Sequence, residues 1–147
     1  MKLQLGGLVL LDASFRHTVE PLSQDAALVY PQTEVPMEVG LMKGEVPNTY
    51  AVTLRIGIQS PNDRYAISVA YAVPLVVDPE GQELPPDFEH RMLITGASMA
   101  LPYCREVISN LTSRARFGTV WINPTNFNQI IPPPQQQQVA EATVATE

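Results

Sequence analysis

The sequence predicts an α+β fold in which an antiparallel β-sheet comes first and helices follow. Segments within residues 3–73 alternate apolar and polar side chains, as strands with one buried face do. Residues 87–116 instead repeat apolar side chains at spacings of three and four, which is typical of amphipathic helices. Strands that precede helices, rather than alternating with them, indicate an α+β fold and not a parallel α/β fold.

Four antiparallel strands are expected. Their predicted ranges are residues 3–15, 35–42, 50–59 and 65–73. Gly6 and Gly7 loosen the first strand and favour a bulge or an edge there. Residues 16–32 form a long connection, whereas residues 60–63, Ser-Pro-Asn-Asp, are a tight-turn sequence. The last two strands should therefore form a hairpin.

Two helices are expected after the strands. Asp87 can cap a short helix over residues 88–95, which Gly96 would end. A longer helix runs from about Ser98 to Arg116, so that Pro102 falls near its first turn, where proline is tolerated. Its apolar stripe contains Leu101, Cys104, Ile108, Leu111 and Ala115.

The length of 147 residues suits one domain with a real core. We place this domain at residues 1–131, with a short apolar segment at 119–122 that contains the single Trp. Three consecutive prolines begin at Pro132 and stop regular structure. Residues 132–147 therefore read as a Pro/Gln-rich disordered tail.

The composition points away from several function classes. Charged residues make up 16%, below the roughly 25% usual in soluble domains, so apolar surface is expected in an oligomer interface or a ligand site. The net charge of −6 and the lack of a basic stripe argue against nucleic-acid binding. No stretch reaches the ~18 apolar residues of a membrane span. With one cysteine and no convincing signal-peptide cleavage pattern, the chain reads as cytoplasmic.

No catalytic or metal site is predicted. His17 and His90 lie far apart in the sequence. Asp87 and His90 could share one face of a helix, but two potential ligands make a poor metal site, and a solvated helix face is the better interpretation. Cys104 lies on the apolar stripe of its helix and reads as a small buried hydrophobe. A glycine-rich phosphate loop is also lacking, so we expect neither a cofactor nor enzymatic activity.

Several segments resemble the SecB protein-export chaperone family. Residues 101–114 are similar to its signature helix, with a Pro-Tyr-x-Arg-Glu core followed by Ser-Arg. Residues 123–127 resemble its Pro-x-Asn-Phe element, residues 11–15 its first-strand Asp-x-Ser-Phe, and residues 50–55 its third strand. The resemblance covers roughly residues 5–131, and the helix with the Asn-Phe pair is its most specific part.

The resemblance implies a dimer of dimers that holds unfolded precursor polypeptides without ATP and keeps them competent for the Sec pathway. The long helices would lie between the sheets of the two dimers. The oligomer interface is expected at Leu101, Tyr103, Cys104, Ile108 and Leu111. The client-binding groove is expected at Val29, Tyr30, Val39, Leu41, Phe127, Ile130 and Ile131. Val39 and Leu41 fit an ordinary core equally well.

The resemblance also implies a surface that docks SecA, the export motor. Asp12 and Ile67 match the family at this surface, but Arg16 and Val69 stand where carboxylates are expected. Replacing acidic groups in this way predicts weak, salt-sensitive SecA binding. Two alternatives remain. One is a SecB-like chaperone dedicated to an antitoxin or another single client, without SecA, and the other is a small-ligand-binding oligomer.

Overall fold

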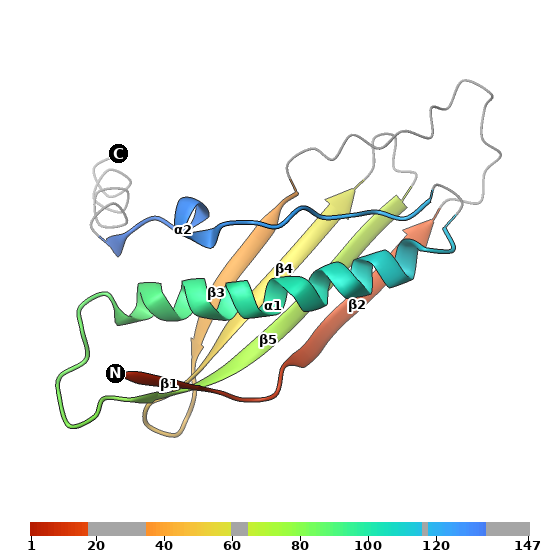
Figure 1. The fold of residues 1–147 in the computed structure, drawn as a ribbon. Helices are drawn as coiled ribbons and strands as arrows, with labels where there is room; N and C mark the ends of the chain where they lie inside the picture. Colours follow the sequence, from red (N-terminus) through yellow and green to blue (C-terminus); the bar gives the residue numbers. More distant parts are fainter. Residues whose placement is uncertain (18–34, 60–64, 116–117, 135–147) are drawn as a thin grey trace, which may run out of the picture.

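The computed structural model describes residues 1–17, 35–59, 65–115 and 118–134. Within them, an antiparallel sheet carries one long and one short helix, which confirms the predicted α+β class (Figure 1). The strands are β1 (Lys2–Leu5), β2 (Val9–His17), β3 (Met37–Lys43), β4 (Thr49–Gln59) and β5 (Tyr65–Asp78). The helices are α1 (Phe88–Thr112) and α2 (Phe127–Ile130). Most of the predicted connection at residues 16–32 and most of the predicted tail lie outside the described residues.

The five strands occupy four positions in the sheet. Their order is β1-β5-β4-β3, and β2 also pairs with β5, further along the strand than β1 does. The predicted first strand is thus present but divided at residues 6–8. At the division, the Gly6 N–H donates to the Pro74 carbonyl over 2.8 Å. The two glycines thus mark a break between two strands, whereas the register shift lies further on, between Leu10 and Asp12.

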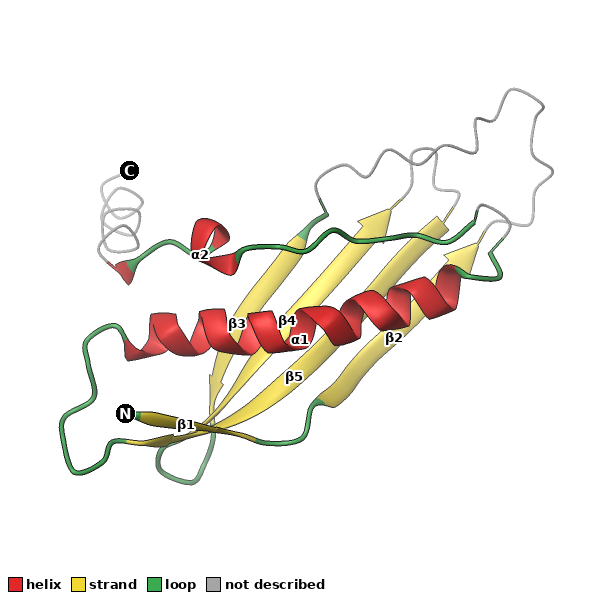
Figure 2. Cartoon of the chain, in the orientation of Figure 1, coloured by secondary structure: helices red, strands yellow, loops and turns green. Residues whose placement is uncertain are grey.

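The sheet has one covered and one open face. Side chains alternate along β4 and β5, so Val52, Leu54 and Ile56 share a face with their cross-strand neighbours and are fully buried. We call this side the helix-covered face, because α1 and the chain that follows it both lie in front of it (Figure 2). The other side, which we call the open face, carries small residues. They are Ala51, Thr53, Gly57, Ala66, Ser68, Ala70 and Ala72.

The helical region is one continuous helix of 25 residues, so the predicted break at Gly96 is wrong. Gly96 is buried inside α1, and a Cβ built there would lie 2.7 Å from both Cγ atoms of Val52. The glycine therefore permits close approach of helix and sheet rather than ending the helix. Pro102 consequently lies in the helix interior instead of a first turn, with its ring exposed.

The chain after α1 returns along the helix and completes the core. Thr112, which is fully buried, donates its hydroxyl to the Ile108 carbonyl over 2.7 Å and accepts from the Val120 N–H over 2.9 Å. Further on, Arg105 Nε donates to the Ile122 carbonyl over 2.7 Å. These bonds hold residues 118–122 against α1 and place the Ile122 side chain in the core.

Part of the predicted oligomer interface is core instead. Leu101, Cys104 and Ile108 are buried in the cluster formed by α1 and its own sheet, so these three predictions are corrected. Burial also raises the pKa of the Cys104 thiol to about 11. An amphipathic stripe looks the same in sequence whether it packs on its own sheet or on a partner. Tyr103 is exposed and Leu111 is half-buried, so these two remain accessible.

Candidate functional site

The first candidate surface is the edge of the helix-covered face at β3. This strand is the last in the sheet order, and Val39 and Leu41 pair in register with Leu54 and Val52. Both side chains contact the core while remaining half-buried. An apolar side chain in this state stabilises the fold and still offers area to a ligand. The two predicted roles of Val39 and Leu41, core and groove, are thus compatible here.

The C-terminal residues expected in the groove divide into two kinds. Phe127 is 1% exposed and Ile131 is 7% exposed, so both belong to the core and neither presents a surface to a ligand. Ile130, which lies between them in the sequence, is 50% exposed. Trp121 is 62% exposed and was not predicted as a site residue. It is followed by the buried Ile122, and neighbouring residues of an extended segment point to opposite sides, so the sequence could have indicated that Trp121 faces outward. The remaining expected residues, Val29 and Tyr30, lie outside the described residues.

A second apolar surface lies where α1 meets β2 and β5. The rings of Tyr71 and Tyr103 lie 5.9 Å apart between centroids, and Leu10 pairs with Tyr71 across the strands. Met99 precedes Tyr103 by one helical turn. We call Leu10, Tyr71, Met99 and Tyr103 the tyrosine patch. Desolvation by burial raises the pKa of Tyr71, and electrostatic repulsion from Cys104, Glu106 and Tyr103 adds smaller effects in the same direction. Of the four, only Tyr103 was predicted, because the cross-strand register is not visible in sequence.

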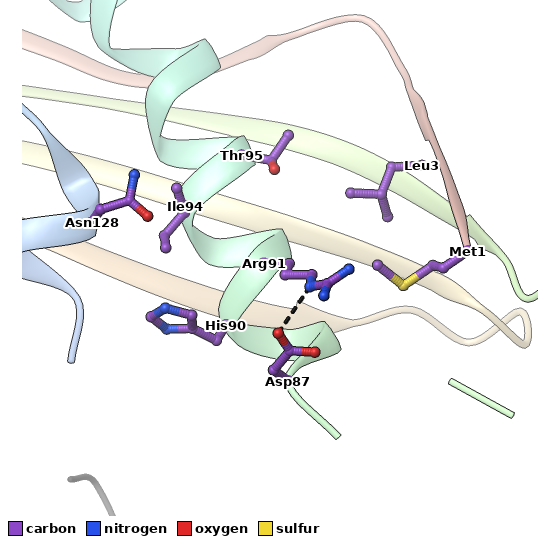
Figure 3. A pocket seen from close by; sticks show the side chains of 8 residues that line it. All are labelled: Met1, Leu3, Asp87, His90, Arg91, Ile94, Thr95 and Asn128. Atoms are coloured by element: carbon purple, nitrogen blue, oxygen red, sulfur yellow. Dashed lines mark hydrogen bonds and ion pairs between the residues drawn. The ribbon is translucent and has the colours of Figure 1, made fainter. Parts of the chain in front are cut away.

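A shallow depression of about 570 Å³ lies beside the first turns of α1 (Figure 3). It is lined by Met1, Leu3, Asp87, His90, Arg91, Ile94, Thr95 and Asn128. Arg91 Nε donates to the Asp87 carboxylate over 2.9 Å, so these two charges neutralise each other. His90 Nδ1 is buried and has no hydrogen-bond partner within the described part of the chain. Among those residues, no three potential metal ligands gather at one place.

The open face carries a small polar network that includes Asp12 of the predicted docking surface. The Asp12 carboxylate accepts from Arg55 Nη1 over 3.0 Å and from Ser68 Oγ over 2.8 Å. Arg55 Nη1 also donates to Ser68 Oγ over 3.2 Å. The predicted acidic contact at Asp12 is therefore already paired within the chain. Arg16 is exposed nearby on β2, in register with Ala66.

Two of the positions assigned to docking lie on the wrong face. Ile67 is 2% exposed and Val69 is 0% exposed, and both pack beneath α1 on the helix-covered face. Successive side chains of a strand point to opposite faces, so Ala66, Ser68 and Ala70 are the β5 residues on the open face. Neither Ile67 nor Val69 can contact a docked partner, and this prediction is corrected.

No helix within the described ranges has the length and apolar character needed to cross a membrane. The model of the SecB family, described as preprotein translocase subunit SecB, matches residues 1–138. No curated protein matches the chain.

Solved structures share the fold, and two of them are described here in turn. One is the Mycobacterium tuberculosis Rv1957 SecB-like chaperone in complex with a ChAD peptide from the Rv1956 HigA1 antitoxin, with a TM-score of 0.64 and 17% identity. The alignment covers 84% of this chain and 87% of that one. The other is a protein of unknown function from Streptococcus agalactiae, with a TM-score of 0.51 and 14% identity over 84% of this chain and 98% of that one.

Proposed function

The chain belongs to the SecB family, and from this premise we propose that it is an ATP-independent chaperone that binds unfolded precursor polypeptides and keeps them competent for export. The family match across residues 1–138 carries this proposal. Members of this family act as chaperones and not as enzymes. We further propose that the protein works in the cytoplasm, where precursors await the Sec pathway.

The distribution of apolar side chains supports this function. A chaperone that only holds its client needs accessible apolar area with adaptable contacts and requires no reacting groups. Ile130 and Trp121 on the returning chain, the half-buried Val39 and Leu41, and the tyrosine patch supply such area on the helix-covered side. Accessible apolar surface spread over several sites suits a long unfolded segment better than a small compact ligand.

We also propose a homotetramer assembled as a dimer of dimers. Tyr103 and Leu111 are the accessible members of the expected interface set, and the tyrosine patch adds Leu10 and Met99 beside Tyr103. Repeated binding surfaces on one oligomer would raise the effective concentration for a single long client. Affinity would then rise without any stronger individual contact.

A second candidate is a chaperone dedicated to one client, such as an antitoxin. It is favoured by the likeness to the M. tuberculosis SecB-like chaperone, which is in complex with an antitoxin peptide. The pairing of Asp12 with Arg55 points the same way, because it removes an acidic contact that SecA docking would use.

Aggregation of a chemically unfolded precursor, followed by light scattering without nucleotide, tests the proposed function. The purified chain should suppress aggregation at roughly stoichiometric amounts, and a natively folded form of the same precursor should not compete. Equal suppression of a broad set of precursors favours the general chaperone, and suppression of one client favours the dedicated one. A chain that leaves aggregation unchanged for all of them is not a chaperone of this kind, and the small-ligand alternative then gains.

A further inference from the structure

The returning chain, residues 118–131, has the composition of a segment that a chaperone would bind. Every residue in it is uncharged, and it has no regular structure before the short helix α2. Its large apolar side chains are Val120, Trp121, Ile122, Phe127, Ile130 and Ile131. An unfolded precursor offers a chaperone the same features, which are extended backbone and apolar side chains without fixed partners.

The apolar side chains of the returning chain divide between two sides. Ile122, Phe127 and Ile131 are at most 7% exposed and lie in the core formed with α1 and the sheet. Trp121 and Ile130 point outward, with 62% and 50% of their surface exposed. The returning chain thus lies on the helix-covered side as a bound peptide would, with one side buried and the other facing solvent (Figure 2).

Few hydrogen bonds attach the returning chain to the rest of the molecule. Within the described residues its backbone–backbone bonds are local, and they join Gly118 to Ala115, Gln129 to Asn126 and Ile131 to Phe127. No described strand pairs with it. Its hydrogen bonds to α1 come from two side chains, Arg105 and Thr112. A segment with so few backbone bonds to its surroundings opens at a lower cost than a strand of the sheet.

The returning chain begins at a residue that can act as a hinge. Gly118 has a φ of 87°, a conformation that glycine adopts without strain. Rotation at Gly118 would lift the returning chain and leave α1 intact. Such a movement need not expose the core to water, because apolar side chains of a client could take the places of Ile122, Phe127 and Ile131.

We propose that the returning chain is an internal competitor of the client. An incoming unfolded polypeptide first contacts Trp121 and Ile130, and its apolar side chains then replace the inner side chains of the returning chain. The inference rests on the proposed chaperone function and concerns the regulation of that binding. The apparent affinity for a client is reduced according to the fraction of molecules that are open. Because the competitor is tethered to its own site, only a polypeptide with several accessible apolar side chains displaces it.

Variants that loosen the returning chain should bind clients more tightly. Arg105→Met keeps a long unbranched side chain but removes the donor to the Ile122 carbonyl. Loss of this hydrogen bond should raise the open fraction, and with it the affinity for an unfolded precursor, by roughly five-fold. Phe127→Ala removes the largest buried side chain of the returning chain and should raise the affinity further. Fluorescence anisotropy of the labelled precursor measures both effects.

The matched control for Phe127→Ala is Val77→Ala. It also leaves a cavity in the core, but Val77 lies where β5 pairs with β1, in register with Leu3. Val77→Ala should therefore lower stability and leave the affinity for the precursor unchanged. If Phe127→Ala does not fold, Arg105→Met decides the question by itself.

Hydrogen exchange read by mass spectrometry locates the movement in the full chain. Binding of the precursor should speed exchange in peptides that cover residues 118–131, because the N–H groups of Val120 and Ile131 lose their acceptors. Peptides that cover β4 should keep their exchange rates. A client that lay on top of a closed returning chain would instead slow exchange there.

Three results overturn the inference. They are slower or unchanged exchange of residues 118–131 in the complex, no gain in affinity for Arg105→Met, and equal gains for Phe127→Ala and Val77→Ala. A chain that gives any of these results and still suppresses aggregation keeps the chaperone function and loses only this inference. A chain that neither binds the precursor nor suppresses its aggregation, in the parent and in Arg105→Met, loses both.

Discussion

Substituting Gly96 by alanine tests how closely α1 packs on the sheet. The new Cβ would lie 2.7 Å from Cγ1 and Cγ2 of Val52, well inside normal carbon–carbon contact. Forcing an extra methyl into a packed core costs about 1–3 kcal/mol. Against this, Ala is better than Gly in a helix interior by about 1 kcal/mol. Because Val52 is fully buried, the helix must shift, so we expect a net loss at the upper end, about 1–2 kcal/mol.

Urea unfolding followed by circular dichroism measures this loss, with every variant at the same protomer concentration because assembly contributes to stability. Gly57→Ala is the matched control, since a Cβ there meets nothing within 4 Å. It should be neutral or slightly stabilising. In a Val52→Ala background the two Cγ contacts are gone but the Cβ of residue 52, the atom nearest to the new methyl, remains. Gly96→Ala should therefore still destabilise that background, by less than it destabilises the parent. A Gly96→Ala variant as stable as the parent would refute the close approach of helix and sheet.

The remaining predictions concern the returning chain, the thiol and the exposed apolar residues. Thr112→Val leaves the part-buried backbone N–H of Val120 without its acceptor and should lower the free energy of unfolding by about 1 kcal/mol in urea, whereas Thr112→Ser should lower it less. The pKa of Cys104 is raised from 9.0 to about 11 in the folded state, so stability is retained below pH ~9 and falls as the pH rises toward 11. Cys104→Ala should flatten that alkaline fall in thermal unfolding. Ile130→Asp should weaken binding of an unfolded precursor by several-fold at unchanged oligomer mass. Tyr103→Asp should shift light scattering toward smaller species, and an unchanged mass would remove the tyrosine patch from the proposed interface.

The alternation of apolar and polar side chains predicted the sheet well, because β4 and β5 bury large apolar side chains on one face only. Residues 50–59 were placed correctly within one residue of β4. The last strand was predicted to stop at Val73, before Pro74, yet β5 continues to Asp78. The Pro74 carbonyl accepts from Gly6, so its backbone faces the interruption between β1 and β2. Pro74 has no N–H, and at this gap between β1 and β2 no strand requires a hydrogen-bond donor from it. The sequence alone does not reveal where this gap lies.

Errors at the helix and at the docking surface have different physical causes. Gly96 carries the local signature of a helix end, whereas its actual role depends on Val52, which lies 44 positions earlier and meets it only in the folded state. Ile67 and Val69 share the apolar alternation of Val73, which correctly indicates the buried face. Assigning the family's docking positions to Ile67 and Val69 disregarded this alternation. Neighbouring residues of a strand point to opposite faces, so an assignment that is wrong by one residue puts the side chain on the wrong face.

The corrected faces change what SecA binding requires. Val69→Glu would bury a charge under α1 and destabilise the fold instead of restoring an acidic contact. On the open face, Asp12 and Glu38 are balanced in number by Arg16 and Arg55, although the chain as a whole carries −6. Long-range attraction of a basic partner follows the net charge, but close docking depends on the charges that it meets. A basic partner such as SecA would therefore be steered toward the chain by its net charge and would gain little from close contact with this face.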